Sequence, residues 1–238
     1  MSTQLSIGAH VDQTDPVAEA VARGTTLVQF FLGDPQGYKG PEVRYAGGAE
    51  ALRADAEEAG VDLYVHAPYI VNVATTNNRI RIPSRKLLQQ HMDAAAEIGA
   101  KGLIVHGGHV NKDDDPAVGF DNWRKAIRSR CRAIASADGS DDVGFCLDTC
   151  HAWAGGIELG DAVDRIRAIT GRIDLVHAND SRDDFDSGAD RHASFGQGRL
   201  PADEFAGVVR EAGAPVICET PGGAAEHRAD FAWLRERL

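Results

Sequence analysis

Seven short apolar, β-branched runs alternate with amphipathic helical patterns along the whole chain. The runs cover residues 5–11, 26–33, 62–69, 102–109, 143–151, 173–180 and 214–220. The helical patterns cover residues 15–24, 48–60, 84–100, 121–136, 159–170, 201–213 and 224–238. Alternation of this kind predicts an α/β fold with a parallel sheet covered by helices. A chain of 238 residues can bury a full core without disulfides, and we expect one domain over residues 1–238.

Most of the apolar runs end in a residue that can carry chemistry. His66, His106, Asp148, His177 and Glu219 each stand at or near the C-terminal end of a run. In a TIM-type (β/α) barrel that edge is the active-site face, where side chains from distant parts of the chain converge. An open doubly wound sheet uses the same edge but gathers fewer strands around one point. We therefore predict a (β/α) barrel with its site at this edge.

The three histidines at run ends favour a metal site. A single histidine in such a place is more often a hydrogen-bonded structural residue than a ligand. Here His66, His106 and His177 occupy equivalent positions of three runs, and carboxylates occupy that position in two more. Structural histidines have no reason to keep such a register. Imidazole with carboxylate is the ligand set of zinc, and less exclusively of manganese or iron.

Two short motifs extend the candidate site beyond the run ends. In LDTCH, Asp148 ends an apolar run and His151 lies just beyond it, so the two can serve neighbouring positions. In DRH, Asp190 and His192 share one face if the loop is extended. The other acids of this loop are assigned to solvent, namely Asp183, Asp184 and Asp186.

The formal net charge of −11 argues against nucleic-acid binding by bulk electrostatics, because phosphate neutralisation needs clustered Lys and Arg. It does not exclude DNA as a partner, because bound divalent cations reverse the local field. The sequence RIRIPSRK at 79–86 is a basic patch. Taken alone, we interpret it as a solvated loop followed by a helix start.

Cysteine use and the N-terminal sequence favour a cytoplasmic protein. The four cysteines lie within or beside apolar runs, and Cys146 and Cys150 do not form a C-x-x-C pair, a pattern typical of reduced thiols. No stretch approaches the roughly twenty apolar residues of a membrane span. The first residues lack the basic and apolar regions of a signal peptide. We expect no association with a membrane.

Seven motifs stand in order at the run ends: GAHV, VHAPYIVN, VHGGH, CLDTCH, HANDS, GADRHASFGQG and ICETP. Together they resemble the endonuclease IV family (AP endonuclease family 2), the zinc-dependent apurinic/apyrimidinic endonucleases, over nearly the whole chain. LDTCH followed by HxNDS and DRHxxxGxG is the most specific part of this resemblance. The resemblance implies a TIM barrel, three zinc ions, and hydrolysis of the phosphodiester 5′ to an abasic site in base excision repair.

The resemblance also implies a set of ligands. Eight residues correspond to zinc ligands in three groups: His66 with His106; Asp148 with His177 and Glu219; and His151 with Asp190 and His192. Of these, we expect a catalytic role for Glu219, Asp148 and His106. Zinc ions can lower the pKa of a bound water to about 7, supplying hydroxide as the nucleophile, so no side-chain nucleophile is needed. The expected cofactor is Zn²⁺, in two or three copies, with Mn²⁺ as an alternative.

One β/α unit of the family has no counterpart in this chain. The family carries a further strand between the runs at 102–109 and 143–151, ending in a glutamate within an ENTAG context that bridges the first two zinc ions. Here the helical pattern through Ser136 passes by ADGSDD directly into Val143. We therefore expect seven β/α units rather than eight.

The missing unit affects both the sheet and the first metal position. Seven strands either close with a changed diameter and shear or leave two unpaired edges. The first zinc keeps two histidines and needs another ligand. Candidate replacements follow His106 in the sequence, although a solvated loop explains them better: Asp113, Asp114 and Asp115.

The resemblance places DNA contacts in two loops. Tyr69 and Asn72 in HAPYIVN match the family pattern. In GDPQGYKG, Gln36 takes a position often held by arginine, while Tyr38 and Lys39 offer a stacking ring and a phosphate contact. The Gly and Pro content of that loop also fits a simple turn. We expect duplex DNA with abasic sites as the partner, no protein partner, and a monomer.

Two other functions remain open from the sequence. A divalent-metal sugar isomerase or epimerase on a similar barrel would use histidine and carboxylate at strand ends, but it gives no reason for the separate DRH site. A catalytically weakened or inactive DNA-damage-binding paralogue is suggested by the missing unit. Retention of the other ligand residues argues against such decay.

Overall fold

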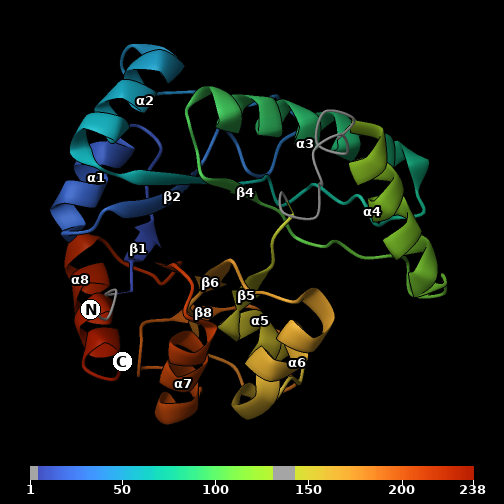
Figure 1. Cartoon of the computed structure of the whole chain (residues 1–238). Helices are drawn as coiled ribbons and strands as arrows, with labels where there is room; N and C mark the ends of the chain where they lie inside the picture. Colours follow the sequence, from blue (N-terminus) through green and yellow to red (C-terminus); the bar gives the residue numbers. More distant parts are fainter. Residues whose placement is uncertain (1–4, 131–142) are drawn as a thin grey trace. The chain divides into compact units, whose positions relative to one another are not determined.

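The computed structural model describes residues 5–130 and 143–238, which fall into two compact units. One unit contains the chain up to Val11, Val17–Gln29 and Gly144–Leu238; the other contains Asp12–Pro16 and Phe30–Val143. Parallel strands and helices build both units, as the ribbon in Figure 1 shows. The prediction of one domain over residues 1–238 stays a prediction.

The first unit has the strand order β2-β1-β9-β6-β5, and the paired strands run parallel. The strands are β1 (Ile7–His10), β2 (Leu27–Phe31, which continues into the second unit), β5 (Cys146–Asp148), β6 (Leu175–His177) and β9 (Val216–Cys218). A separate antiparallel pair consists of β7 (Asp180–Ser181) and β8 (His192–Ala193). The helices are α1 (Pro16–Arg23), α5 (Thr149–Ala154), the 3-10 helix η1 (Leu159–Asp161), α6 (Ala162–Thr170), α7 (Ala202–Ala212) and α8 (Ala224–Arg235).

The second unit continues the order as β2-β3-β4. Its further strands are β3 (Asp62–His66) and β4 (Gly102–Ile104), which pair in parallel. Its helices are α2 (Gly48–Ala59), α3 (Asn78–Glu97) and α4 (Pro116–Arg130). Over the described residues the sheet thus has seven strands, and β4 and β5 end the order. These two strands flank the place where the sequence lacks a β/α unit.

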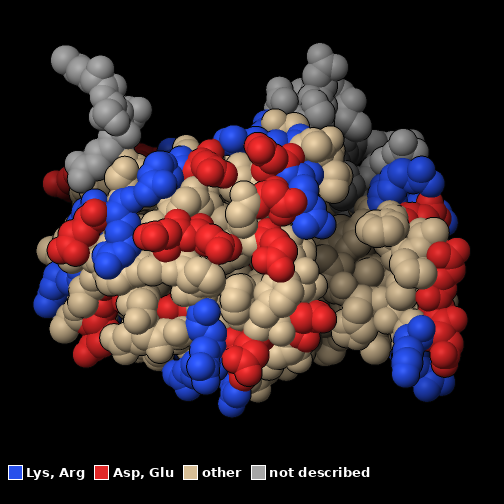
Figure 2. All heavy atoms as spheres, turned by 90° about the horizontal axis from the view of Figure 1, so that it is seen from below, with Lys and Arg blue, Asp and Glu red and all other residues tan. Residues whose placement is uncertain are grey.

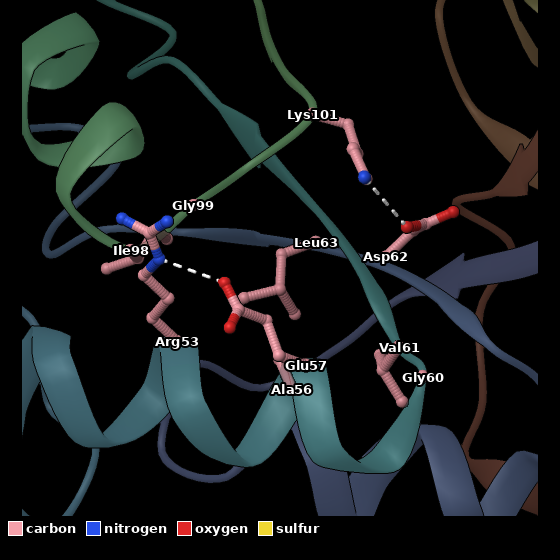
Figure 3. Close-up of a pocket in the computed structure, with 10 residues that line it drawn as sticks. All are labelled: Arg53, Ala56, Glu57, Gly60, Val61, Asp62, Leu63, Ile98, Gly99 and Lys101. Carbon is pink, nitrogen blue, oxygen red and sulfur yellow. Dashed lines mark hydrogen bonds and ion pairs between the residues drawn. The ribbon is translucent and has the colours of Figure 1, made fainter.

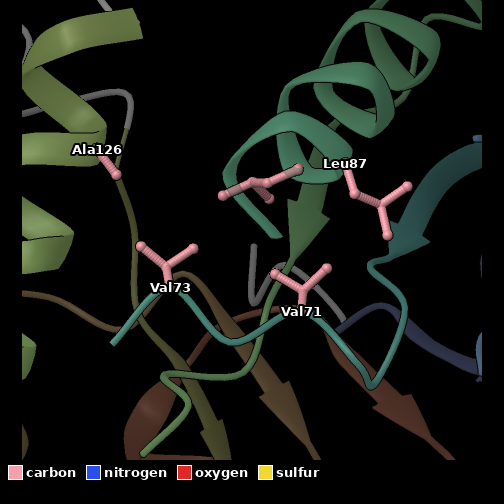
Figure 4. Close-up of a cluster of buried hydrophobic side chains, with 5 residues drawn as sticks. Val71, Val73, Leu87 and Ala126 are labelled. Carbon is pink, nitrogen blue, oxygen red and sulfur yellow. The ribbon is translucent and has the colours of Figure 1, made fainter. Parts of the chain in front are cut away.

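Apolar periodicity accounts for the core of each unit. In the first unit, α7 buries Phe205, Val208, Val209 and Ala212, which follow the i, i+3, i+4, i+7 spacing of one helix face. All of β9 is buried, as expected for a parallel strand covered on both faces. In the second unit, a buried cluster joins the loop after β3 to α3 and α4 (Figure 4), and consists of Val71, Val73, Leu87, Leu88 and Ala126.

The structure corrects several predicted boundaries. Helix α3 begins at Asn78 instead of residue 84, because the side chain of Asn77 accepts a hydrogen bond from Arg79 N and caps the helix ahead of Pro83. The basic patch at 79–86 is therefore helical. The predicted helix at 121–136 begins earlier, at Pro116, and residues 131–136 lie outside the described part. Helix α5 and the β7–β8 pair were not predicted, because both are too short to show a period.

No helix within the described residues is long and apolar enough to cross a membrane. Cys146, Cys150 and Cys218 are free thiols, in agreement with the predicted reduced state, and Cys131 lies outside the described residues.

Candidate metal centre

Asp148, His177 and Glu219 meet at the C-terminal edge of three neighbouring strands of the first unit. Asp148 and His177 are register partners at the ends of β5 and β6, and Glu219 directly follows β9. His177 Nδ1 lies 3.3 Å from Glu219 Oε2 and 3.7 Å from Asp148 Oδ2. One ligand atom from each residue lies within 4.8 Å of the other two. The structure therefore brings together the residues predicted for the second metal position.

His151, Asp190 and His192 form a second cluster in the same unit. His151 belongs to α5, which begins directly after Asp148, and His192 begins β8. The Asp190 carboxylate lies between the rings, 2.9 Å from His151 Nε2 and 3.0 Å from His192 Nε2. His192 Nε2 is buried, yet it makes no hydrogen bond to the described chain. The residues predicted for the third position are thus also brought together.

His66 and His106 face each other in the second unit. His66 ends β3, and His106 lies two residues beyond β4. Their Nε2 atoms are 3.2 Å apart. His66 Nδ1 lies 2.7 Å from the carbonyl oxygen of Ala67 and donates its proton there, which leaves Nε2 as the basic nitrogen. Tyr69 contacts both rings, at centroid distances of 5.4 and 5.9 Å.

The donor separations in these clusters suit a bound metal ion. Zinc–nitrogen bonds of about 2.0–2.1 Å in a tetrahedron place ligand atoms roughly 3.3 Å apart. The two Nε2 atoms of His66 and His106 match that separation. His192 Nε2 approaches Asp190 without hydrogen-bond geometry, as two ligands of one ion do. The mixed nitrogen and oxygen donors therefore fit a divalent ion such as zinc.

Among the described residues, the groups of three or more potential metal ligands include neither His66 nor His106. Asp114 instead accepts hydrogen bonds from Thr76 Oγ1 and Asn111 Nδ2, at 2.5 and 2.7 Å. Asp115 accepts one from Ala117 N at the start of α4. Asp114 thus joins its loop to the loop after β3, while Asp113 and Asp115 are exposed, which favours the solvated-loop interpretation for those two.

Neighbouring carboxylates raise the pKa of one histidine in each of the two clusters of the first unit. Burial alone would lower the pKa of His177, but Glu219 and Asp148 raise it well above the ordinary value. Burial acts likewise on His192, but Asp190 and Asp148 raise its pKa to about 9. Because a ligand must lose its proton to bind a metal, metal binding at both clusters should strengthen as pH rises.

Sequence reasoning missed four residues that contact the clusters. Asn179 donates to Asp148 Oδ2 at 3.0 Å, and its own Oδ1 accepts from Glu219 N at 2.8 Å. His10 and Gln29 lie beside Glu219 Oε1, at 3.7 and 2.6 Å. Cys150 lies within ligand distance of the third cluster, but burial raises the pKa of its thiol to about 12. His10 in GAHV, Asn179 in HANDS and Cys150 in CLDTCH each stand in a motif at a run end, whereas Gln29 has no such signal.

The acids between His177 and Asp190 differ in their surroundings. Asp184 and Asp186 are exposed, in agreement with the prediction. The assignment of Asp183 to solvent was wrong. Its carboxylate is largely covered and pairs with two nitrogens of the Arg191 guanidinium. Arg191 stands between Asp190 and His192 in the sequence, so this ion pair restrains the backbone that carries both residues.

The residues predicted to contact DNA lie in loops of the second unit, and four of them are exposed. Tyr69 and Tyr38 have exposed fractions of 55% and 51%, and Lys39 and Gln36 are exposed as well. Asn72 is buried, and its amide donates to His109 O while its Oδ1 accepts from His109 N and Thr75 N. Asn72 thus orders the loops after β3 and β4.

A surface pocket lies at the opposite ends of the second unit's strands. Figure 3 shows it between α2 and the starts of β3 and β4, with ion pairs Arg53–Glu57 and Lys101–Asp62 at its rim. It contains none of the predicted site residues. In a (β/α) barrel this end serves stability more than catalysis.

The chain is similar to proteins of known family in both sequence and structure. A family model described as "Xylose isomerase-like TIM barrel" matches residues 17–138 and 129–237. "Probable endonuclease 4" of Mycobacterium bovis (strain BCG / Pasteur 1173P2) is 50% identical over 255 residues, covering 97% of this chain and 98% of that protein. Endonuclease IV from Thermus thermophilus has a TM-score of 0.78 at 27% identity, covering 97% and 99% of the two chains. A D-tagatose 3-epimerase-like protein shares the fold, with a TM-score of 0.75 at 17% identity and coverage of 98% and 97%.

These matches confirm the predicted TIM-type fold and agree with a missing β/α unit. The alignment with the mycobacterial protein is 255 positions long, whereas this chain has 238 residues. The relative therefore contains a stretch without a counterpart here. The family model matches the chain in two segments that overlap at residues 129–138.

Proposed function

Since the chain belongs to the endonuclease IV family, we propose that it hydrolyses the phosphodiester bond 5′ to an abasic site in duplex DNA, with divalent metal ions as cofactors. The observation that carries the proposal is the pair of ligand clusters in the first unit, Asp148–His177–Glu219 and His151–Asp190–His192. The named endonuclease relative, which is half identical over nearly the full length, supports it.

The chain's own residues hold the two clusters in a fixed relation. Asp148 Oδ1 accepts a hydrogen bond from His151 N and caps α5, so one turn of helix sets the distance between the clusters. Asp148 Oδ2 faces His177 Nδ1 and also lies 3.7 Å from His151 Nδ1. Ions bound here would supply hydroxide near neutral pH and neutralise charge on the scissile phosphate. No side chain is then needed as nucleophile.

Zinc is the metal that we propose, because imidazole and carboxylate supply every ligand in the two clusters. Manganese accepts the same donors less selectively. Burial raises the pKa of the Cys150 thiol to about 12, so Cys150 would become a ligand only if a bound ion displaced its proton. We propose His66 and His106 as a further, weaker position, since the family's bridging glutamate has no counterpart here.

Contact with DNA is proposed for the exposed Tyr69, Tyr38, Lys39 and Gln36. Tyr rings can stack on bases, and Lys can contact a phosphate. Figure 2 shows Lys and Arg side chains interspersed with Asp and Glu on the face that it presents. With a formal net charge of −11, affinity must therefore come from local contacts and bound cations.

An incision assay tests the proposal. We expect the zinc-loaded protein to cut a duplex with one abasic site on the 5′ side of that site, and a chelator to abolish the cut. Asp190→Asn should lower the rate by more than the 10–100-fold typical of outer-sphere partners, whereas Asp184→Asn, at an exposed loop position, should match the wild type. A folded, metal-loaded protein that binds the duplex without cutting it would contradict the proposal and identify a damage-binding paralogue.

A further inference from the structure

The amide of Gln29 connects three side chains beside the second metal position. Gln29 lies in β2 with no exposed surface, and it is the register partner of His10 on β1. Its Oε1 lies 2.8 Å from His177 Nε2. Its Nε2 donates to Glu219 Oε1 at 2.6 Å and lies 3.0 Å from His10 Nδ1. A single neutral side chain thus reaches both an imidazole and a carboxylate of the cluster.

These contacts determine which way the amide points. A carboxylate can only accept hydrogen bonds, so the NH₂ group of Gln29 must face Glu219. The reverse orientation would place two oxygen atoms 2.6 Å apart without a proton. The amide oxygen must then face His177 Nε2, which has to carry a proton to donate to it. In neutral His177 the basic nitrogen is therefore Nδ1, the atom that faces Glu219 Oε2 and Asp148 Oδ2.

We propose that Gln29 is a positioning residue for the second metal position: it holds His177 as the Nε2–H tautomer, with Nδ1 directed at the metal, and it fixes the carboxylate of Glu219. The inference rests on the proposed function, because it assumes that these residues bind a metal. A hydrogen-bond partner on the distant nitrogen of a ligating histidine sets ring orientation and basicity. Gln29 supplies such a partner and restrains a second ligand as well.

The place of Gln29 in the sequence supports a dedicated role. Val28 and Phe30 on either side are fully buried, and the strand is otherwise apolar. A buried amide is costly unless its polar atoms are hydrogen-bonded. At this position both ends of the amide are bonded, and the partners belong to the cluster and to His10.

The first test needs no variant. The zinc-loaded wild-type protein, with ¹⁵N-labelled histidine, should show His177 with its proton on Nε2 and the metal on Nδ1. A His177 that carries the proton on Nδ1 while the metal is bound would overturn the inference. Assignment uses loss of the signal in His177→Gln.

The second test is Gln29→Met, which keeps the length of the side chain and removes its hydrogen bonds. We expect zinc affinity, measured by competition with a chromophoric chelator, to fall about 10–100-fold, and the His177 resonances to shift. The matched control is Gln13→Met, because Gln13 also makes two hydrogen bonds, both to Gly33 in the second unit. That variant should keep wild-type affinity.

The outcomes separate this inference from the proposed function. A Gln29→Met protein with unchanged affinity and unchanged His177 resonances overturns the positioning role, while incision by the wild type still stands. If the folded wild type binds no zinc, the proposed function fails, and the positioning role fails with it. If Gln29→Met does not fold, the tautomer of His177 in the wild-type protein still decides.

Discussion

At the scale of single residues, the burial of His91 predicts that the free energy of unfolding decreases at acidic pH. Its side chain is 1% exposed in α3, and neither ring nitrogen has a hydrogen-bond partner within the described chain. Burial lowers its pKa to about 4. The unfolded chain therefore binds the extra proton between pH 6.5 and 4, so stability is lost as pH falls through that window and is unaffected above it.

The expected loss is at most about 3 kcal/mol, from about 1.36 kcal/mol per pKa unit. Urea unfolding of the wild type and of His91→Leu at about pH 7 and about pH 4.5 measures it. The variant should be about as stable as the wild type at neutral pH, because an apolar side chain leaves no polar atom unbonded. It should lose less stability at the acidic pH, and equal losses in both proteins would contradict the assignment.

Site residues could be predicted from the sequence where they stand in a motif at the end of an apolar run, but not where they lie inside a buried strand. His177 and Glu219 were found because each stands at the end of an apolar run, and strand ends converge in a parallel sheet. Gln29 stands inside such a run, where period and composition indicate only a buried strand. Its role depends on which side chains face it from β1, β6 and β9, and a single sequence does not contain that information.

At the scale of elements, Asp180 holds the loop that follows β8. Its buried carboxylate accepts hydrogen bonds from the backbone N–H groups of Gly196, Gly198 and Leu200, and from Ser181 N. Asp180→Asn should destabilise the protein by about 3 kcal/mol, because an amide nitrogen cannot accept and leaves buried donors unbonded. Urea unfolding with a chelator present measures the loss. Asp184→Asn should change little, and a similar loss in that variant would argue against this role.

Element boundaries show the limit of local patterns. The helical pattern in the sequence was placed at residues 84–100, directly after Pro83. The helix begins six residues earlier, at Asn78. Arg81 in this extra turn donates to Asn122 Oδ1 on α4, at 2.9 Å. The contact joins residues 41 positions apart in the sequence, so no local pattern could indicate it.

At the scale of the whole molecule, the missing β/α unit predicts unequal metal positions. The first unit offers three potential ligands at each of two positions, Asp148–His177–Glu219 and His151–Asp190–His192, whereas His66 and His106 are two. Zinc sites use three or four protein ligands, and affinity falls when water must replace one. When the zinc-loaded protein is titrated with a chelator, we therefore expect two ions to be retained after any third has left.

Variants assign the ions measured in that titration. His106→Ala should abolish only the weakly held ion, and Asp190→Asn should convert one tightly held ion into a weakly held one, because its carboxylate lies between His151 and His192. Zinc per chain, measured by elemental analysis after each chelator step, gives the count. Asp184→Asn should retain the wild-type pattern. Loss of a tightly held ion in His106→Ala would show that the histidine pair has a full ligand set, in which case the missing glutamate has been replaced.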